Sequence, residues 1–192
     1  MLFRSALYQD LLDGARARRD IQRVASALSG LGDVAAAEGD EPTARRFYDE
    51  SLGLFRELQD RWGIAGVLCD LGNLLRDSGA HENACEHYHH TLLLFRELGY
   101  RRGIARVLEC MTICAASQGL AVRALTLAGA AATVRRELGT PALPAEREEL
   151  DRILASLQQT LPPLERSQAW AAGSAMTTKQ ALDYALAMNP SS

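Results

Sequence analysis

The sequence repeats itself with a period of 40 residues, and this repeat constrains the fold more than any other feature. The tripeptide Arg-Glu-Leu begins at residues 56, 96 and 136. The same step relates several tyrosines, alanines and glycines: Tyr8, Tyr48 and Tyr88; Ala44, Ala84 and Ala124; Gly32 and Gly72. A period in this range is typical of repeat proteins, in which each unit buries its apolar surface against its neighbours. The chain is therefore expected to be a stack of similar units.

Each unit reads as two helices joined by a turn. In the unit that begins near residue 60, the first helix has apolar residues at the spacing of one helical face: Ile64, Val67, Leu68, Leu71 and Leu75. A turn follows at Ser78-Gly79, and a second helix carries Ala84, Tyr88, Leu92 and Phe95. The sequence shows no alternating run of β-branched residues, and four of its six prolines lie between 141 and 163. The prediction is an all-α protein.

The repeated positions resemble the tetratricopeptide repeat in a 40-residue form. The motif residues are Leu31-Gly32, Ala44 and Tyr48 in one unit and Leu71-Gly72, Ala84 and Tyr88 in the next. A third unit departs from the motif, with Thr112, Ala128 and Arg135 replacing the glycine, the tyrosine and the phenylalanine. The resemblance implies an α-α superhelix of about three and a half hairpins over residues 1–139. The expected parts are a half repeat at 1–18 and hairpins at 20–58, 60–98 and 100–139.

Residues 140–188 are expected to form a helical C-terminal cap. Pro144 begins a helix that runs from about 145 to 159, Pro162-Pro163 precede a short helix through Trp170, and Thr177 or Thr178 caps a final helix. The runs at 169–173 and 176–185 resemble the C-terminus of bacterial multidomain signalling ATPases, which include LuxR-type transcriptional regulators. That resemblance implies the sensor end of such a protein. The chain shows no phosphate-binding loop and no recognisable helix-turn-helix.

Charge and composition exclude several classes of partner. The net charge of −3 provides no electrostatic reason to expect direct nucleic-acid binding. No run of eighteen apolar residues is present, so no membrane span is expected. The four cysteines lack paired-motif spacing, which favours a reduced, cytoplasmic setting. No nucleophile–base–orienter set can be assembled, so neither enzymatic activity nor a cofactor is expected.

A cluster of histidines is the only candidate for a metal site. All four histidines lie within residues 81–90, and His81, Cys85 and His89 share one helical stripe. Two neighbours four residues apart can hold zinc, but the third lies a further turn away, outside the same tetrahedron. A polar outer helix face is the simpler reading, and metal binding is not expected. Cys110 and Cys114 share a helix face and are interpreted as packed thiols.

The predicted binding surface is the concave groove that the resemblance implies, lined by the first helix of each hairpin. Its candidate residues are Ser29, Asp33, Cys69, Asn73, Arg76, Asp77, Arg106 and Glu109. Asn73, Arg76 and Arg106 offer donors to peptide carbonyls or an acidic side chain. A full carboxylate clamp is not expected, because Ser29 and Asp33 stand where that clamp needs Lys and Asn. Solvated residues with no ligand remain the alternative.

These features favour a non-catalytic protein-interaction and sensor module that binds a protein or peptide in its groove. It would be the C-terminal regulatory part of a bacterial signalling ATPase or transcriptional regulator. The alternative is a self-contained scaffold, unrelated to transcription, that self-assembles or recruits an enzyme. A homodimer is also expected through the N-terminal half repeat, because its helix lacks a hairpin partner and leaves apolar residues without a full set of neighbours: Phe3, Leu7, Leu11 and Leu12.

Overall fold

The chain is entirely helical wherever the structure describes it. The computed structural model describes residues 2–141, 144–157 and 159–187, which form ten helices and no strand. They group into two compact units, residues 1–80 and residues 81–192. This confirms the predicted fold class. The division falls after Ala80, whereas the sequence predicts a boundary between repeats and cap near residue 139.

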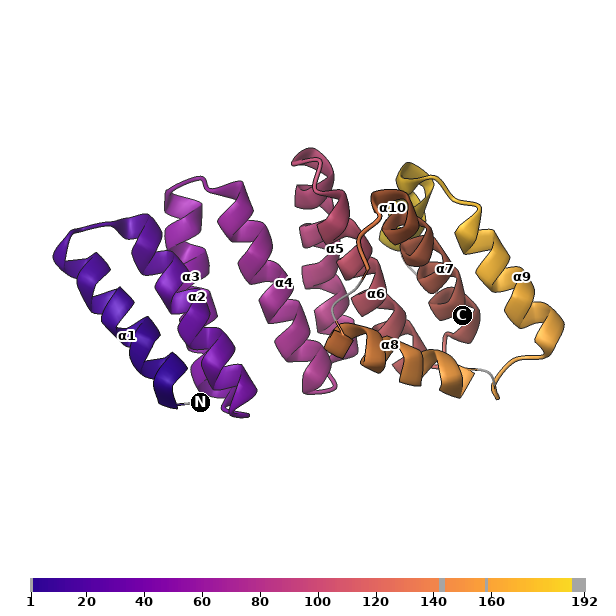
Figure 1. The fold of residues 1–192 in the computed structure, drawn as a ribbon, viewed down its shortest axis with the longest axis horizontal. Helices are drawn as coiled ribbons and strands as arrows, with labels where there is room; N and C mark the ends of the chain where they lie inside the picture. The colour runs from indigo at the N-terminus through magenta and orange to yellow at the C-terminus, as the bar shows by residue number, and fades with distance from the viewer. Residues whose placement is uncertain (1, 142–143, 158, 188–192) are drawn as a thin grey trace. The chain divides into compact units, whose positions relative to one another are not determined.

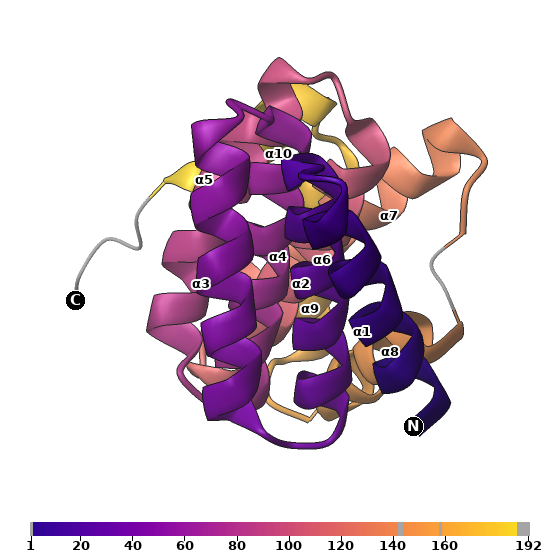
Figure 2. The same ribbon diagram turned by 90° about the vertical axis from the view of Figure 1, so that its left-hand side faces the viewer.

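Unit 1 (residues 1–80) holds four helices in chain order (Figure 1). They are α1 (Leu2–Ala17), α2 (Ile21–Ala37), α3 (Glu41–Glu57) and α4 (Arg61–Asp77). Each packs against the next one along the chain, and α2 also contacts α4. Figure 2 shows α1, α2 and α3 side by side at the N-terminal end. A core cluster lies between α1 and α2 and is made by Leu12, Ala27, Leu28 and Leu31.

Glycine and tyrosine recur together because they pack against each other. A Cβ atom at Gly32 would lie 2.5 Å from the ring of Tyr48, so only glycine leaves room for that ring. Gly30 meets the ring of Tyr8 in the same way. The aromatic position of one helix therefore selects a glycine on the helix beside it.

The turns follow a 20-residue rhythm within the 40-residue repeat. A residue with positive φ follows each of the first seven helices, at Arg19, Gly39, Gln59, Gly79, Gly99, Gly119 and Gly139. Glycine adopts this left-handed conformation without a Cβ clash, which explains its recurrence there. After the first three helices, the next residue is an aspartate that caps the following helix: Asp20, Asp40 or Asp60 accepts a backbone N–H from that helix. Tyr100 and Leu120 occupy the corresponding positions of unit 2 without a side-chain cap.

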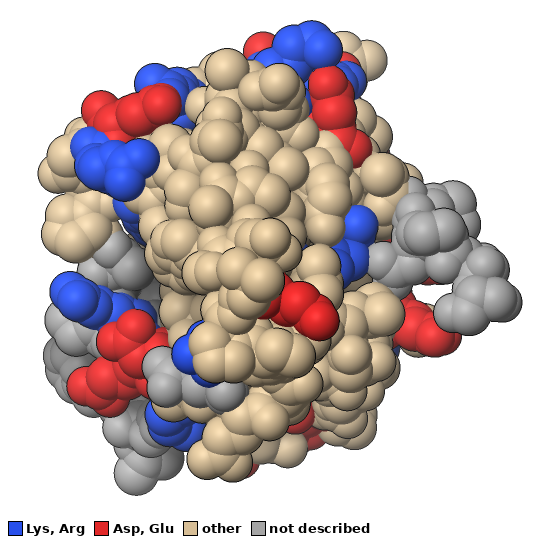
Figure 3. All heavy atoms as spheres, turned by 90° about the vertical axis from the view of Figure 1, so that its right-hand side faces the viewer, with Lys and Arg blue, Asp and Glu red and all other residues tan. Residues whose placement is uncertain are grey.

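Unit 2 (residues 81–192) contains the remaining helices. They are α5 (His81–Glu97), α6 (Arg101–Ser117), α7 (Ala121–Leu138), α8 (Pro144–Leu157), α9 (Pro163–Ser174) and α10 (Thr178–Leu186). Helix α7 packs between α6 and α9. The crossing of α7 and α9 is close, because a Cβ at Gly129 would lie 2.5 Å from the Trp170 carbonyl oxygen. Figure 3 shows that few charged side chains lie on the end face of this unit. Leu164 and Trp170 of α9 are exposed.

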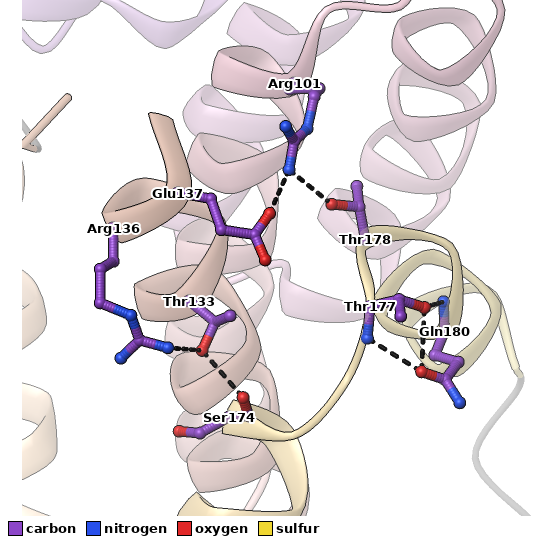
Figure 4. Close-up of polar contacts among 8 residues, drawn as sticks. All are labelled: Arg101, Thr133, Arg136, Glu137, Ser174, Thr177, Thr178 and Gln180. Atoms are coloured by element: carbon purple, nitrogen blue, oxygen red, sulfur yellow. Dashed lines mark hydrogen bonds and ion pairs between the residues drawn. The ribbon is translucent and has the colours of Figure 1, made fainter. Parts of the chain in front are cut away.

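Within unit 2, polar contacts hold the cap helices α9 and α10 against α6 and α7 (Figure 4). Arg101 of α6 forms an ion pair with Glu137 of α7 and donates to the Thr178 hydroxyl of α10 at 3.1 Å. Thr133 donates to the Ser174 carbonyl at the end of α9. Thr177 caps α10 with a reciprocal contact from Gln180, as the sequence predicts. The short helix predicted to end at Trp170 continues to Ser174.

Candidate functional site

The polar candidates of unit 1 lie on α2 and α4, two helices that contact each other. We refer to this set as the α2–α4 polar face, which comprises Ser29, Asp33, Asp70, Asn73, Arg76 and Asp77. Asp33 and Asp77 are exposed, and the other four side chains are half-buried. Five of the six are residues that the sequence analysis selects, and Asp70 is added by the structure.

Tyr48 of α3 contacts this face through a hydrogen bond. Its hydroxyl donates a hydrogen bond of 2.9 Å to Asp33 Oδ1. Burial raises the pKa of Tyr48 well above its usual range, and the charges of Asp33, Asp70 and Asp77 raise it further. The phenol therefore stays protonated and keeps donating to Asp33. Three carboxylates are close enough to one hydroxyl to affect its ionisation, so negative charge is concentrated here.

The one arginine on this face is already engaged. Arg76 donates to Asp77 Oδ1 through Nε at 2.8 Å, and a terminal nitrogen lies 2.7 Å from the same oxygen. The side chain of Arg76 is only 12% exposed, whereas that of Asp77 is 63% exposed. Within this set of six residues, three carboxylates accompany one guanidinium. The main contact of Arg76 on this face is therefore its ion pair with Asp77, and little of its guanidinium is exposed to a partner.

The remaining groove candidates have different surroundings. Cys69 is buried within unit 1. Arg106 and Glu109 belong to α6 in unit 2, where Arg106 is exposed and Glu109 is buried. Arg135 grips the Glu109 carboxylate with two hydrogen bonds of 3.0 and 2.7 Å. The role of all eight predicted groove residues in partner binding stays a prediction.

Unit 2 contains a cavity that sequence reasoning did not identify as a site. It has a volume of about 500 Å³, within the usual range of small-molecule sites. Its wall combines polar residues of α5 with apolar residues of α6 and α7. The lining residues are Glu82, Cys85, Glu86, His89, Met111, Ala115, Gln118, Arg123, Leu127 and Ala187.

Arg123 holds the end of the cap at the edge of this cavity. It donates hydrogen bonds of 3.0 Å to the carbonyl oxygens of Ala185 and Ala187. Its guanidinium also lies 5.2 Å from the centre of the Tyr184 ring. Burial lowers the pKa of His89 nearby, although a hydrogen bond with the Ala185 backbone opposes the shift. The lowered pKa favours the neutral form of His89.

Only two of the three candidate metal ligands, His81, Cys85 and His89, line this cavity. Cys85 and His89 line it, whereas His81 is not part of its wall. Across residues 2–141, 144–157 and 159–187, no three His, Cys, Asp or Glu side chains are grouped so that they could hold a metal ion. The four-residue spacing identified Cys85 and His89. Arg123 was missed because only packing brings it beside them.

Comparison with solved structures identifies the fold. The crystal structure of BtubC (BKLC) from P. vanneervenii is similar to this chain, with a TM-score of 0.51 and 20% sequence identity. The similarity covers 95% of this chain and 88% of BtubC. The fold is tetratricopeptide-like. No family model and no curated protein matches the sequence.

The tetratricopeptide-like fold agrees with the motif residues of the repeats. The helices follow one another as antiparallel neighbours, as in BtubC. In the part of the chain that is described, no helix is both long enough and apolar enough to cross a membrane. The similarity to BtubC supports the fold and does not support a role in transcriptional regulation.

Proposed function

We propose that this chain is a non-catalytic scaffold that binds a protein segment on the α2–α4 polar face. The observation that carries the proposal is the set of carboxylates around Tyr48, held on neighbouring helices of a tetratricopeptide-like fold. Exposed polar groups that are already oriented by protein contacts lose little entropy when a partner binds. The face is thus suited to recognition.

The charge of the face selects the chemistry of the partner. The face has three carboxylates, from Asp33, Asp70 and Asp77, and one guanidinium, from Arg76. Arg76 already forms an ion pair with Asp77. In place of the acidic group considered from the sequence, we propose a segment that presents Lys or Arg side chains. Charge complementarity of this kind sets partner choice and association rate more than raw affinity.

Binding of matched peptides tests this proposal. Fluorescence anisotropy would compare peptides of equal length that are basic, neutral or acidic. We expect basic peptides to bind and added salt to weaken them. Asp33→Asn or Asp70→Asn should then weaken binding by about 1–2 kcal/mol, roughly five- to thirtyfold in Kd. Asp33→Asn still accepts a hydrogen bond from Tyr48, so the fold should be preserved.

Asp49→Asn is the matched control, because Asp49 is an exposed aspartate on α3 outside the polar face. It removes the same charge and should leave binding unchanged. An equal loss in the Asp49 variant would show that only net charge matters. Preferential binding of acidic peptides would contradict the proposed partner chemistry.

A second proposal concerns the context of the scaffold. The C-terminal runs that resemble those of signalling ATPases and LuxR-type regulators support a role as the regulatory part of such a protein. The reading frame of the gene tests it directly. A nucleotide-binding domain encoded upstream in the same frame would support the regulatory role, and a start codon at Met1 would favour the independent scaffold.

A further inference from the structure

Two cysteines of unit 2 meet across neighbouring helices. Cys85 lies one turn after the start of α5, and Cys114 lies one turn before the end of α6. Because α5 and α6 are consecutive and antiparallel, these positions lie at the same level. The two side chains form a hydrogen bond. Both are thiols in the structure.

The two sulfur atoms differ in access. Cys85 is half-buried and lines the cavity of about 500 Å³. Cys114 is fully buried and does not line it. A small oxidant that enters the cavity therefore reaches Cys85 first. Cys114 can react only with a group already formed on Cys85.

The surroundings of Cys85 favour the reactive form of its thiol. The hydrogen bond with Cys114 lowers the pKa of the Cys85 thiol most, and the positive charge of Arg123 lowers it further. Burial and the carboxylate of Glu82 act in the opposite direction but do not cancel the shift. Glu86 and His89 also face the cavity. The thiolate, which is the nucleophilic form, is enriched relative to an ordinary cysteine.

We propose that Cys85 and Cys114 are a redox-active pair that hydrogen peroxide converts to a disulfide between α5 and α6. The Cys85 thiolate attacks one peroxide oxygen, the O–O bond breaks, and hydroxide leaves, so that Cys85 becomes a sulfenic acid. The Cys114 thiol then loses its proton to hydroxide, and its sulfur attacks the Cys85 sulfur. The S–O bond breaks, and the second oxygen leaves as water after taking up the proton that the Cys85 thiol released when it ionised. Two thiols are oxidised, and one peroxide is reduced to two waters.

Mass spectrometry of the full chain tests the pair. After treatment with hydrogen peroxide, the intact mass should fall by two hydrogen atoms, and a non-reduced digest should contain the Cys85 peptide joined to the Cys114 peptide. A thiol reductant should reverse both changes. Cys85→Ala and Cys114→Ala should each abolish this cross-link. Cys69→Ala and Cys110→Ala, which remove other buried thiols, should preserve it.

A trapping experiment separates the two roles. In Cys114→Ala, a sulfenic-acid reagent such as dimedone should label Cys85 after peroxide treatment, because no second thiol resolves the intermediate. In Cys85→Ala, Cys114 should remain unlabelled. Circular dichroism of each variant verifies that the helices are retained. Where that spectrum is lost, Cys85→Ser and Cys114→Ser replace the alanine variants.

Three results would overturn the proposal. The first is that peroxide leaves both thiols reduced in the folded protein. The second is that the cross-link joins a different pair of cysteines. The third is that Cys114 is the residue labelled first, which would reverse the assignment of the attacking and resolving thiols.

Discussion

At the scale of single residues, Gly173 shows how closely two helices can approach. A Cβ at this position would overlap the Thr126 carbonyl oxygen of α7, so Gly173→Ala must push α9 away from α7. We expect a loss of about 1–3 kcal/mol in the free energy of unfolding, measured by urea denaturation. Gly53→Ala is the control, because open space surrounds Gly53 on α3. That change should stabilise the protein by about 0.5–1 kcal/mol.

The Arg135–Glu109 pair accounts for one departure of the third repeat from its motif, the replacement of phenylalanine by Arg135. Arg135 occupies the position that Phe55 and Phe95 hold in the earlier repeats, and Glu109 occupies that of Cys69. Replacing Arg135 with Phe alone should leave a buried, unpaired carboxylate and destabilise the protein by about 3–5 kcal/mol. Adding Glu109→Cys, the residue at the equivalent position of the preceding repeat, removes the unpaired carboxylate and should recover most of the loss.

Thermal and urea unfolding of the two single variants and the double variant would measure this coupling. Additive losses would mean that the pair acts as two independent residues and would contradict the explanation. Recovery in the double variant would show that Arg135 and Glu109 compensate each other.

At the scale of elements, α10 depends on contacts from helices far away in the sequence. Arg123 of α7 binds the carbonyls of Ala185 and Ala187, at the end of α10. Arg123→Ala should release this end and accelerate amide exchange in α10 roughly tenfold or more, equivalent to about 1–3 kcal/mol. Lys179→Ala removes an exposed pair with Asp183 and should change exchange only slightly. Equal exchange in both variants would show that Arg123 does not hold α10.

At the scale of the whole molecule, the expected self-association now depends on fewer residues. Leu12, which the sequence suggested would lack neighbours, is buried against α2, so that part of the expectation is wrong. Leu7 and Leu11 are each about half exposed, at 48% and 49%. The side chain of Phe3 lies outside the described residues. Leu7→Glu with Leu11→Glu should weaken any dimer.

Sedimentation at about 100 µM would measure this association, because weak micromolar contacts register at that concentration. Leu164→Glu, on the outer side of α9, is the control with a similar change of charge. A wild-type monomer at that concentration would remove the expectation. Dissociation by Leu164→Glu alone would place the interface on α9.

The repeat made the fold class predictable from the sequence. Recurring Gly32 and Tyr48 belong to one contact, and recurring glycines at the turns adopt one backbone conformation. These are local requirements of the individual units, so the residues that meet them recur at a regular spacing in the sequence. The start of α10 was predictable from Thr177 or Thr178 for the same reason, since a helix cap involves only neighbouring residues, and Thr177 is the cap.

The chemistry of the candidate sites was decided by tertiary structure. Arg76 was interpreted as an open donor, but Asp77, the next residue in the sequence, binds it, and the packing of α2 against α4 adds Asp33 to the same face. Arg123 and Cys114 come together with Cys85 only because α5, α6 and α7 pack together. Periodicity reports which side of a helix is buried, since burial repeats with every turn. It carries no information about which polar side chains on different helices come within hydrogen-bonding distance, because packing and rotamers determine that.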